Sequence, residues 1–443
     1  MAGKKTQAQL TPEEKLQQAL VPEAEQPYKV PANWCWTFVK YVSEVVTGGT
    51  PSKKHPEYYG NNFPFFKPAD LDAERHVYTA SEYLSDAGKN VSRIIPKYST
   101  AVCCIGSIGK SGYLEIDGTT NQQINSAIPK FDPLYFYYFT KTNYFITQLW
   151  QKASATTISI VNKTKMEDCF FPLPPLAEQQ RIVERIESLF AKLDEAKENL
   201  QNVLDGFETR KAAILHKAFT GELTAKWRKQ HGVSMDSWEE KALGKIVKNI
   251  KDKYEPTLNN KKCVKYIGLE HIEKNNGIIG FGSSDDVKSL KTIFELGDIL
   301  YGKLRPYLNK HDIAKFSGIC STDILVYRAE DFNTAKFINY FMNTEKFIFY
   351  TVSNSKGINL PRISEKEVSG ILVNVPTLSE QSEIVRIIDD LLAKEQQAKE
   401  LAENAITKID IIKKSILARA FRGELGTNNP ADEPAVELLK RVL

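Results

Sequence analysis

The sequence lacks both the long apolar runs of membrane proteins and the cysteine pairs of disulfide-rich ones. Residues 1–20 are polar without the apolar core of a signal peptide, and no later stretch approaches the roughly 20 apolar residues of a membrane span. The six cysteines are scattered without a CxxC motif, and the six histidines do not cluster with them. We therefore expect a cytoplasmic chain without structural zinc, a metal site or a disulfide framework.

The chain is nevertheless too long for a single ordinary domain. Its 443 residues exceed what one hydrophobic core usually serves, so two domains are expected. The net charge of +4 is weak evidence for nucleic acid as a partner. A local concentration says more, because residues 241–265 contain eight lysines and only Asp252 and Glu255 as acidic residues. This segment is either a nucleic-acid contact or a solvated lysine-rich edge.

An internal repeat is the strongest signal in the sequence. Residues 176–223 match residues 378–425 without a gap at a spacing of 202 residues, and 21 of the 48 positions are identical. Trp36 and Trp238 share this spacing. The chain is therefore a duplication whose unit runs roughly from the tryptophan to a Gly-Glu-Leu sequence at 221–223 and again at 423–425.

Apolar or small residues recur within the repeat on the 4-3 spacing of a coiled-coil seam. In the first copy these positions are Ile182, Ile186, Leu189, Leu193, Ala196, Leu200, Val203, Phe207 and Ile214. In the second copy they are Ile384, Ile388, Leu391, Glu395, Ala398, Ala402, Ala405, Ile409, Ile412 and Ile416. The pattern predicts one long helix in each copy.

Proline and glycine mark where these helices begin and end. Pro174–Pro175 and Pro376 precede them, Ser379 is a candidate N-cap, and Gly221 and Gly423 suit the C-terminal stops. About 40 helical residues would span ~60 Å. A helix of that length must pack on something, and antiparallel pairing of the two copies would hold two domains apart. The alternative is two helical hairpins buried in ordinary cores.

The segments between the repeats read as mixed domains in which short apolar runs are broken by Gly, Pro, Asn and Asp. Strands are expected at 100–105, 299–301 and 324–327, and helices at 132–150 and 335–352. Residues 102–110 and 299–310 occupy the same place in the two copies but differ in sequence. The frame is common and the contents diverge, as expected when each insert recognises something different.

Several motifs together resemble those of the type I restriction-modification specificity subunits (HsdS family). PLPPLAEQQRIV at 172–183 and AFTGELT at 218–224 are echoed by VPTLSEQSEIV at 375–385 and AFRGELG at 420–426. GGTPSKK and YYGNNFPFFKPADL within 48–71 resemble the opening of that family's target-recognition domains. GDILYGKLRPYL and GICSTDILVYR resemble another common form of the domain. The resemblance covers nearly the whole chain.

The predicted fold is α/β (α+β), with two strand-containing target-recognition domains separated by two long antiparallel coiled-coil helices in a pseudo-twofold internal duplication. The expected segments are an N-terminal helical segment (1–28), recognition domain 1 (29–173), a first long helix (174–225), recognition domain 2 (226–375), a second long helix (376–426) and a C-terminal tail (427–443). The family often brings its termini together, and TPEEKLQQAL at 11–20 and EPAVELLKRVL at 433–443 are helix-like.

The resemblance implies a subunit that reads DNA and has no catalytic site of its own. Each recognition domain would read one half of a bipartite, asymmetric target in double-stranded DNA, while the long helices set the spacer and dock two modification (methyltransferase) subunits. Two restriction (motor-nuclease) subunits would complete the enzyme. S-adenosylmethionine, ATP and Mg²⁺ would then act in the partner subunits, with no cofactor in this chain.

Two motifs suggest enzymatic alternatives and fail on closer reading. GSIGKS at 106–111 resembles a phosphate-binding loop, but Cys104 stands where the first glycine is required. DPLY at 132–135 resembles a methyltransferase tetrapeptide, but Leu134 interrupts it, and Asp132 with Pro133 fits a helix start. The alternatives to the specificity subunit are a self-contained DNA methyltransferase and a coiled-coil scaffold joining two protein-binding domains.

Polar loop residues are the candidates for DNA contact, because Arg and Lys pair with guanine, Asn and Gln pair with adenine, and Ser, Thr and Lys hold phosphates. In the first domain they are Ser52, Lys53, Lys54, Asn61, Asn62, Lys110, Asn121, Gln122 and Gln123. In the second they are Lys261, Lys262, Lys303, Arg305, Tyr307, Asn309 and Lys310. For each of them a solvated or turn-forming role is an equal alternative. Tyr58 and Tyr59 could stack on a sugar or base, or pack in the core.

Overall fold

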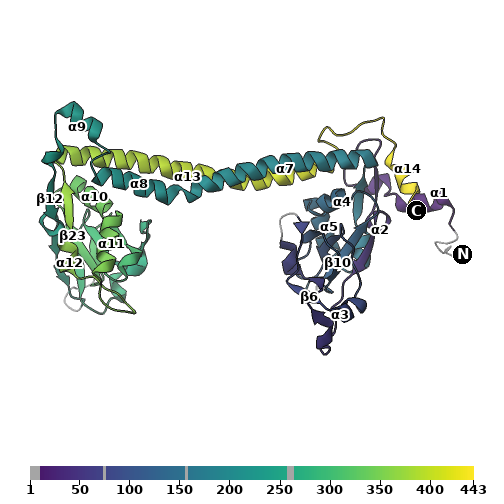
Figure 1. Cartoon of the computed structure of the whole chain (residues 1–443), viewed down its shortest axis with the longest axis horizontal. Coiled ribbons are helices and arrows are strands. Elements are labelled where there is room, and N and C mark those ends of the chain that lie inside the picture. Colours follow the sequence, from purple (N-terminus) through teal and green to yellow (C-terminus); the bar gives the residue numbers. More distant parts are fainter. Residues whose placement is uncertain (1–9, 73–75, 155–157, 257–263) are drawn as a thin grey trace. The chain divides into compact units, whose positions relative to one another are not determined.

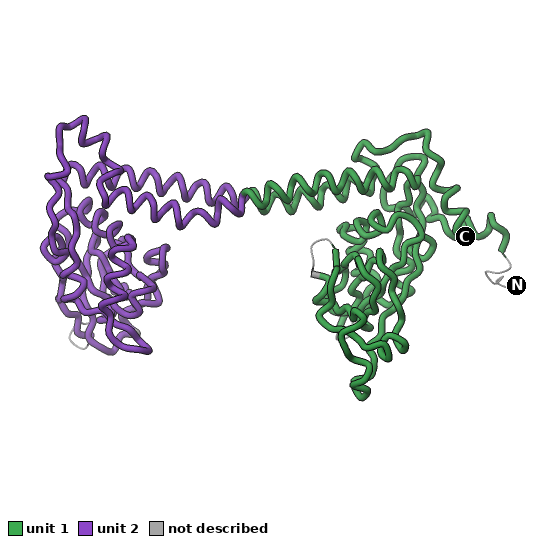
Figure 2. The backbone as a smooth tube through the Cα atoms, viewed as in Figure 1, with its two compact units in different colours: residues 1–199, 405–443 green, residues 200–404 purple. Residues whose placement is uncertain are grey.

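The protein is described by a computed structural model that covers residues 10–72, 76–154, 158–256 and 264–443 (Figure 1). The chain divides into two compact units (Figure 2). The first consists of residues 1–199 and 405–443, and the second of residues 200–404. The first unit therefore combines both ends of the chain, whereas the second is one continuous segment.

The first unit is built on two mixed sheets. One has the strand order β2-β10-β7-β8-β5 and the other β3-β6-β4-β9, while β1 pairs antiparallel with β11. The strands are β1 (Cys35–Phe38), β2 (Ser43–Thr47), β3 (Tyr59–Gly60), β4 (Phe63–Phe66), β5 (His76–Val77), β6 (Glu82–Leu84), β7 (Thr100–Cys103), β8 (Ser111–Leu114), β9 (Thr119–Thr120), β10 (Ile124–Pro129) and β11 (Phe170–Leu173). The predicted strand at 100–105 is confirmed as β7.

Short capped helices accompany these strands. They are α1 (Pro12–Ala19), α2 (Val39–Val42), α3 (Asp86–Asn90), α4 (Pro133–Thr140), α5 (Asn143–Lys152) and α6 (Lys163–Glu167). Asp132 caps α4 by accepting the Tyr135 N–H, and Pro133 is its first residue, as predicted. The single helix expected over 132–150 is wrong, because Thr142 accepts the Phe145 N–H and starts α5 as a separate helix.

The second unit repeats this plan with different details. Its sheets have the orders β13-β23-β20-β21 and β14-β19-β22-β15-β18, with two-stranded pairs β12-β24 and β16-β17. The strands are β12 (Glu239–Ala242), β13 (Lys248–Ile250), β14 (Lys253–Tyr254), β15 (Lys265–Ile267), β16 (Ile272–Glu273), β17 (Gly277–Ile278), β18 (Gly282–Ser283), β19 (Lys291–Phe294), β20 (Ile299–Gly302), β21 (His311–Ile313), β22 (Gly318–Cys320), β23 (Ile324–Arg328) and β24 (Leu372–Val375). Both strands predicted here are present, as β20 and β23.

The helices of the second unit follow the first unit's pattern. They are α9 (Ala225–His231), α10 (Phe332–Phe341), α11 (Glu345–Ser353) and α12 (Glu365–Ser369), with the 3-10 turn η9 (Pro306–Leu308) after β20. The helix predicted over 335–352 is again two helices. Thr344 caps α11 as Thr142 caps α5, and the two threonines lie 202 residues apart. The duplication therefore extends from the long helices into the domains.

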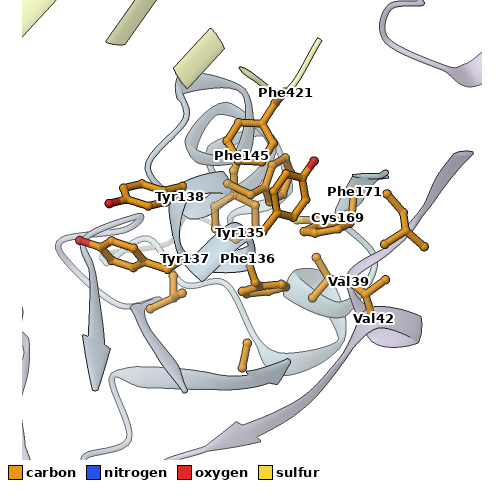
Figure 3. Packing of buried hydrophobic residues seen from close by; sticks show 14 of the residues in the cluster. Val39, Val42, Tyr135, Phe136, Tyr137, Tyr138, Phe145, Cys169, Phe171 and Phe421 are labelled. Carbon is orange, nitrogen blue, oxygen red and sulfur yellow. The ribbon is translucent and has the colours of Figure 1, made fainter. Parts of the chain in front are cut away.

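Each unit has its own aromatic core, in which the ends of the long helices take part. In the first unit, Phe136 stacks on Phe171 at 5.5 Å, and Phe139 lies 5.5 Å from Phe421 near the end of the chain (Figure 3). In the second unit, Phe219 packs against Phe337 at 5.0 Å. Burial of such side chains is the main favourable term in folding. Helix ends from both repeats thus help to stabilise each domain.

The long helices are α7 (Leu176–Asp205), α8 (Phe207–Phe219), α13 (Leu378–Ala420) and, beyond them, the short α14 (Ala435–Lys440). The first predicted long helix is interrupted at Gly206, whereas the second runs for 43 residues without a break. Ser379 is not the N-cap of α13, since it lies inside the helix and the Glu380 N–H donates to Thr377.

Within each unit the long helices pair in opposite directions. In the first unit, Asp194 binds Lys413 and Lys197 lies 3.5 Å from Asp410. In the second unit, Arg210 binds Glu395 at 2.8 Å. Residue numbers rise along one helix as they fall along the other, so the predicted antiparallel pairing is present.

The seam residues are not buried equally along these helices. Ile182, Ile186, Ile384 and Ile388 are fully buried, and Ile409 nearly so. Leu189, Leu193, Leu200, Phe207, Leu391 and Ile416 are half-buried. The fully buried isoleucines belong to the cores of the two domains, where Ile182 packs in the same cluster as Leu173 and Ile384 in the same cluster as Val375. The spacing therefore reports docking of each helix start onto its own domain as well as helix pairing. Val203 and Ile412, which we also placed in the seam, are exposed.

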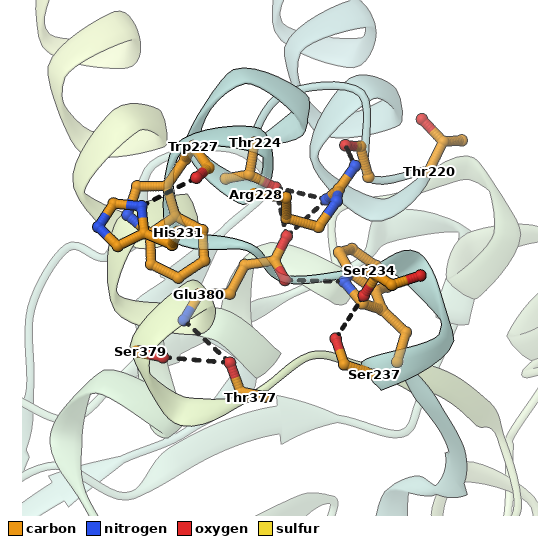
Figure 4. Close-up of polar contacts among 12 residues, drawn as sticks. Thr220, Thr224, Trp227, Arg228, His231, Ser234, Ser237, Thr377, Ser379 and Glu380 are labelled. Atoms are coloured by element: carbon orange, nitrogen blue, oxygen red, sulfur yellow. Dashed lines mark hydrogen bonds and ion pairs between the residues drawn. The ribbon is translucent and has the colours of Figure 1, made fainter.

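A buried carboxylate anchors the start of α13 in the second unit (Figure 4). Glu380 is 0% exposed, and its Oε2 accepts the indole N–H of Trp238 at 3.0 Å. Its Oε1 accepts from Thr224 at 2.7 Å and from Arg228 at 2.5 Å. A buried charge requires such partners, because transfer of an unpaired ion from water is very unfavourable.

The first unit has the same anchor without the arginine. Glu178, also 0% exposed, accepts the indole N–H of Trp34 at 2.7 Å and the amide of Asn428 at 2.8 Å. Thr427 donates weakly to its other oxygen, at 3.4 Å. The structural counterpart of Trp238 is thus Trp34, and our pairing of Trp238 with Trp36 by spacing was wrong by two residues.

The two ends of the chain meet in the first unit. The Ala435 N–H donates to the Asn33 carbonyl at 2.9 Å, and Arg181 of α7 binds Asp432. Helix α14 packs against α1, and both helices predicted at the ends of the chain are present. The tail after 426 therefore fills the place that the connection from 224 to 238 fills in the second unit.

The two anchors predict unequal responses to the same substitution. Glu380→Gln leaves Arg228 buried without its counter-ion and turns an amide toward donors, so we expect a loss of about 3 kcal/mol or more in the second unit. Glu178→Gln can place its amide against the Thr427 hydroxyl, which can also accept, and we expect a loss below about 1 kcal/mol. Native-state hydrogen exchange of each unit would measure both. Equal losses would contradict this account.

Candidate nucleic-acid interface

Three loops meet at one edge of the first unit's sheet. They are the loop 104–110 that follows β7, the turn 121–123 that precedes β10, and the hairpin 154–160. The Cys104 N–H donates to the Gln123 carbonyl at 2.7 Å, and the Val161 N–H donates to the Cys104 carbonyl at 2.9 Å. Backbone hydrogen bonds thus hold all three loops in fixed positions.

The second unit has the same three loops, at 303–309, 321–323 and 356–362. The Lys303 N–H donates to the Asp323 carbonyl at 2.9 Å, and the Ile363 N–H donates to the Lys303 carbonyl at 3.0 Å. We call each set of three loops a loop cluster. The backbone bonds correspond one to one, while the side chains differ.

The predicted DNA-contact residues of the first domain fall partly into this cluster. Lys110, Asn121, Gln122 and Gln123 belong to it. The turn also reaches the loop that carries the exposed Ser52, Lys53 and Lys54, because the Thr50 hydroxyl donates to Gln122 at 2.5 Å. Asn61 and Asn62 are exposed but lie farther along, where the Asn62 amide is 3.4 Å from Asp86.

Two of the aromatic and amide candidates have structural partners. The Asn121 side chain is 7% exposed, and its two polar ends bind the backbone N–H and the side chain of Gln123. The Tyr59 hydroxyl donates to the Pro51 carbonyl at 2.7 Å, while Tyr58 stacks on His55 at 5.0 Å. These side chains shape the loops, and DNA contact by Asn121 stays a prediction.

In the second domain, Lys303, Arg305 and Tyr307 lie in the loop after β20, and the last two are exposed. Asn309 is 5% exposed and donates to the Met342 carbonyl at 3.0 Å. Lys310 donates to the Leu269 carbonyl at 2.7 Å. The last two therefore also have partners within the fold. Lys261 and Lys262 lie outside the described residues.

The loop after β20 has an unusual backbone. Arg305 and Asn309 take left-handed conformations with φ of 50° and 42°, where the first unit's loop has Gly106 and Gly109 at φ of 79° and 88°. A left-handed residue other than glycine costs of order 1 kcal/mol or more and is concentrated at functional sites. An arginine held in this position is therefore a strong candidate for recognition.

Positive charge surrounds the second loop cluster. Arg362 binds Asp323 at 2.8 Å, and Lys303 and Lys253 lie close to this pair. Burial lowers the pKa of Lys303, Asp323 opposes this shift, and Arg362 and Lys253 add to it. Three cations thus share a single carboxylate. In the first unit, burial, aided by Lys110, lowers the pKa of Lys141 to about 8.

The hairpins at 154–160 and 356–362 were missed by the sequence analysis, although they lie 202 residues apart and so keep the spacing of the repeat. By contrast, the rejection of a phosphate-binding loop is supported. Residues 106–111 form a turn between β7 and β8, whereas such a loop leads from a strand into a helix.

Other kinds of site have little support among the described residues. No group of three or more His, Cys, Asp or Glu side chains in the described ranges is placed to hold a metal ion. The five cysteines in these ranges are buried and free. None of the described helices combines the length and the apolarity needed to cross a membrane.

Comparison with known proteins assigns the family. The family profile described as "Type I restriction modification DNA specificity domain" matches residues 31–205 and 235–406. The specificity subunit of the type I restriction enzyme EcoDI from Escherichia coli is 30% identical over 323 residues, which cover 68% of this chain and 72% of that one. The StySPI specificity subunit from Salmonella potsdam is 25% identical over 433 residues, with 92% of each chain covered.

Solved structures share the fold. A chain from work described as "complex assembly and conformational transition of the type I R-M system" has a TM-score of 0.68 and 17% identity, covering 90% of this chain and all of that chain. The HsdS subunit from Thermoanaerobacter tengcongensis has a TM-score of 0.64 and 18% identity, covering 91% of this chain and all of that one. Two recognition domains with linking helices, and a family profile that matches each half, show that the chain belongs to the type I restriction-modification specificity family.

Proposed function

We propose that this chain is the DNA sequence-specificity subunit of a type I restriction-modification enzyme, and that each recognition domain reads one half of a bipartite, asymmetric target. The observation that carries this proposal is the pair of loop clusters. Their backbone bonds correspond, but the loop is Cys-Ile-Gly-Ser-Ile-Gly-Lys in one and Lys-Leu-Arg-Pro-Tyr-Leu-Asn in the other. A shared frame with different side chains suits two readers of different sequences.

The proposal assigns catalysis to partner subunits. The long helices would dock two modification subunits and set the length of the unspecified spacer, and two restriction subunits would complete the enzyme. S-adenosylmethionine, ATP and Mg²⁺ would act in those partners, and the assembly would work in the cytoplasm on intracellular DNA. A self-contained methyltransferase and a scaffold have no comparable observation in their favour.

The pattern of methylation tests the main proposal. When the chain is expressed with its cognate modification subunit, sequencing of modified bases should return two short specified blocks separated by an unspecified spacer. A chain-free control should lack these marks. Marks on one continuous motif, or marks that do not depend on this chain, would overturn the proposal.

Exchange of one domain tests modular reading. Replacing residues 36–171, which run from β1 to β11, with the matching segment of another family member should change one half-site and leave the other as it was. The reason is that each loop cluster is held by bonds within its own unit. A change in both half-sites would count against independent reading.

Matched deletions test the role of the long helices. Removing 193–199 together with their antiparallel partners 407–413 shortens both helices by about 10 Å, the rise of about three base pairs. The modified motif should keep both half-sites and have a shorter spacer. Removing 193–199 alone is the control, because it breaks the helix register and should abolish methylation. An unchanged spacer after the matched deletion would refute a ruler function.

A further inference from the structure

The hairpins of the two loop clusters form a repeated structural device. Lys356 and Arg362 exchange two backbone hydrogen bonds of 2.9 Å, and Ser154 and Ile160 exchange two of 3.0 and 3.1 Å. Both hairpins span seven residues and lie 202 residues apart. A loop kept at the same length and register through a duplication, while its sequence changes, is under a geometric constraint.

Each hairpin is fixed to the loop that follows the neighbouring strand. Arg362 bridges Leu304, and the Arg305 N–H donates to the Pro361 carbonyl at 2.7 Å. In the first unit Ile160 bridges Ile105. The tip of the second hairpin is therefore held beside the left-handed Arg305, and it is not a free surface loop.

The tip of the second hairpin carries apolar side chains into solvent. Ile358 is fully exposed and Leu360 is 56% exposed, with the exposed Asn359 between them. Ile158, which is also exposed, lies 202 residues before Leu360. Single exposed apolar residues are ordinary, but neighbouring ones on a fixed loop mark an interaction site.

The surroundings of this tip favour DNA over protein as its partner. Lys356 and Arg362 form the base of the hairpin, and Lys303, Arg305 and Lys253 lie around it. Cationic side chains hold phosphates, while apolar side chains contact thymine methyl groups or wedge between bases. Asparagine has the donor and acceptor pair that matches adenine. Charge outside and apolar contact at the centre thus fit a nucleic-acid groove.

On the basis of the proposed function, we propose that the hairpin tip Ile358–Leu360 is a specificity-determining contact that enters a groove of the target and reads base edges in the half-site of the second domain. Arg305 and the base of the hairpin position the tip by contacting phosphates beside it. Ile158 marks the equivalent tip in the first domain.

The double variant Ile358→Ser/Leu360→Ser tests this inference in the complex with modification subunits. Both side chains are exposed, so the fold should be unaffected. The matched control is Leu296→Ser, since Leu296 is 67% exposed and lies in the turn before β20, at the opposite end of that strand from the loop cluster. Binding to a cognate duplex and to an unrelated duplex, and the methylated motif, are measured for wild type and both variants.

We expect the tip variant to bind the cognate duplex about tenfold more weakly, in the range of a mismatched base pair, with unrelated DNA bound as before. One or two positions of one half-site should relax, and the Leu296 variant should behave as wild type. Equal weakening on both duplexes, or an unchanged motif and affinity, would overturn the inference. So would poorer assembly with the modification subunit at unchanged affinity of the assembled complex, which would mark the tip as a protein-docking site. A wild type without a bipartite motif would instead refute the proposed function.

Discussion

The buried carboxylate at the start of each second-half helix segment is the constraint on which the rest of the architecture depends. Glu178 and Glu380 are fully buried, and each receives an indole N–H from the tryptophan that precedes the first strand of its domain. One side chain therefore joins the helix start, the domain start and the segment that follows the other long helix. Because an unpaired buried carboxylate is so unfavourable, these three parts form together or not at all. The loop clusters inherit their fixed positions from this arrangement.

Much of the frame could be predicted from sequence because the duplication makes it redundant. The long helices, their antiparallel pairing and the strands β7, β20 and β23 follow from periodicity and from a spacing that occurs twice. Predictions failed where a local hydrogen bond decided the outcome. Thr142 and Thr344 each split a predicted helix, because a threonine that accepts an N–H three residues later starts a new one. The seam was overextended because periodicity does not distinguish a helix packed on a domain from one packed on a helix.

The candidate site was harder to predict, for a different physical reason. Side-chain chemistry selected Arg305, Tyr307 and Lys303 correctly as members of one cluster. It also selected Asn121 and Asn309, whose amides bind within their own loops, because sequence does not show where a polar group finds its partner. The hairpins escaped notice since their significant residues are apolar. Apolar residues are read as core by default, and only the structure shows that Ile358 is in solvent.

The combination of both chain ends in the first unit has a consequence for how the protein is made. Residues 200–404 are contiguous and contain the whole second unit, whereas the first unit needs the tail beyond residue 405, including Asn428 and the helix α14 that packs on α1. During synthesis, domains fold as their residues emerge from the ribosome. The domain that is synthesised first is therefore completed last, and until then the aromatic core that awaits Phe421 is open to solvent and to chaperones.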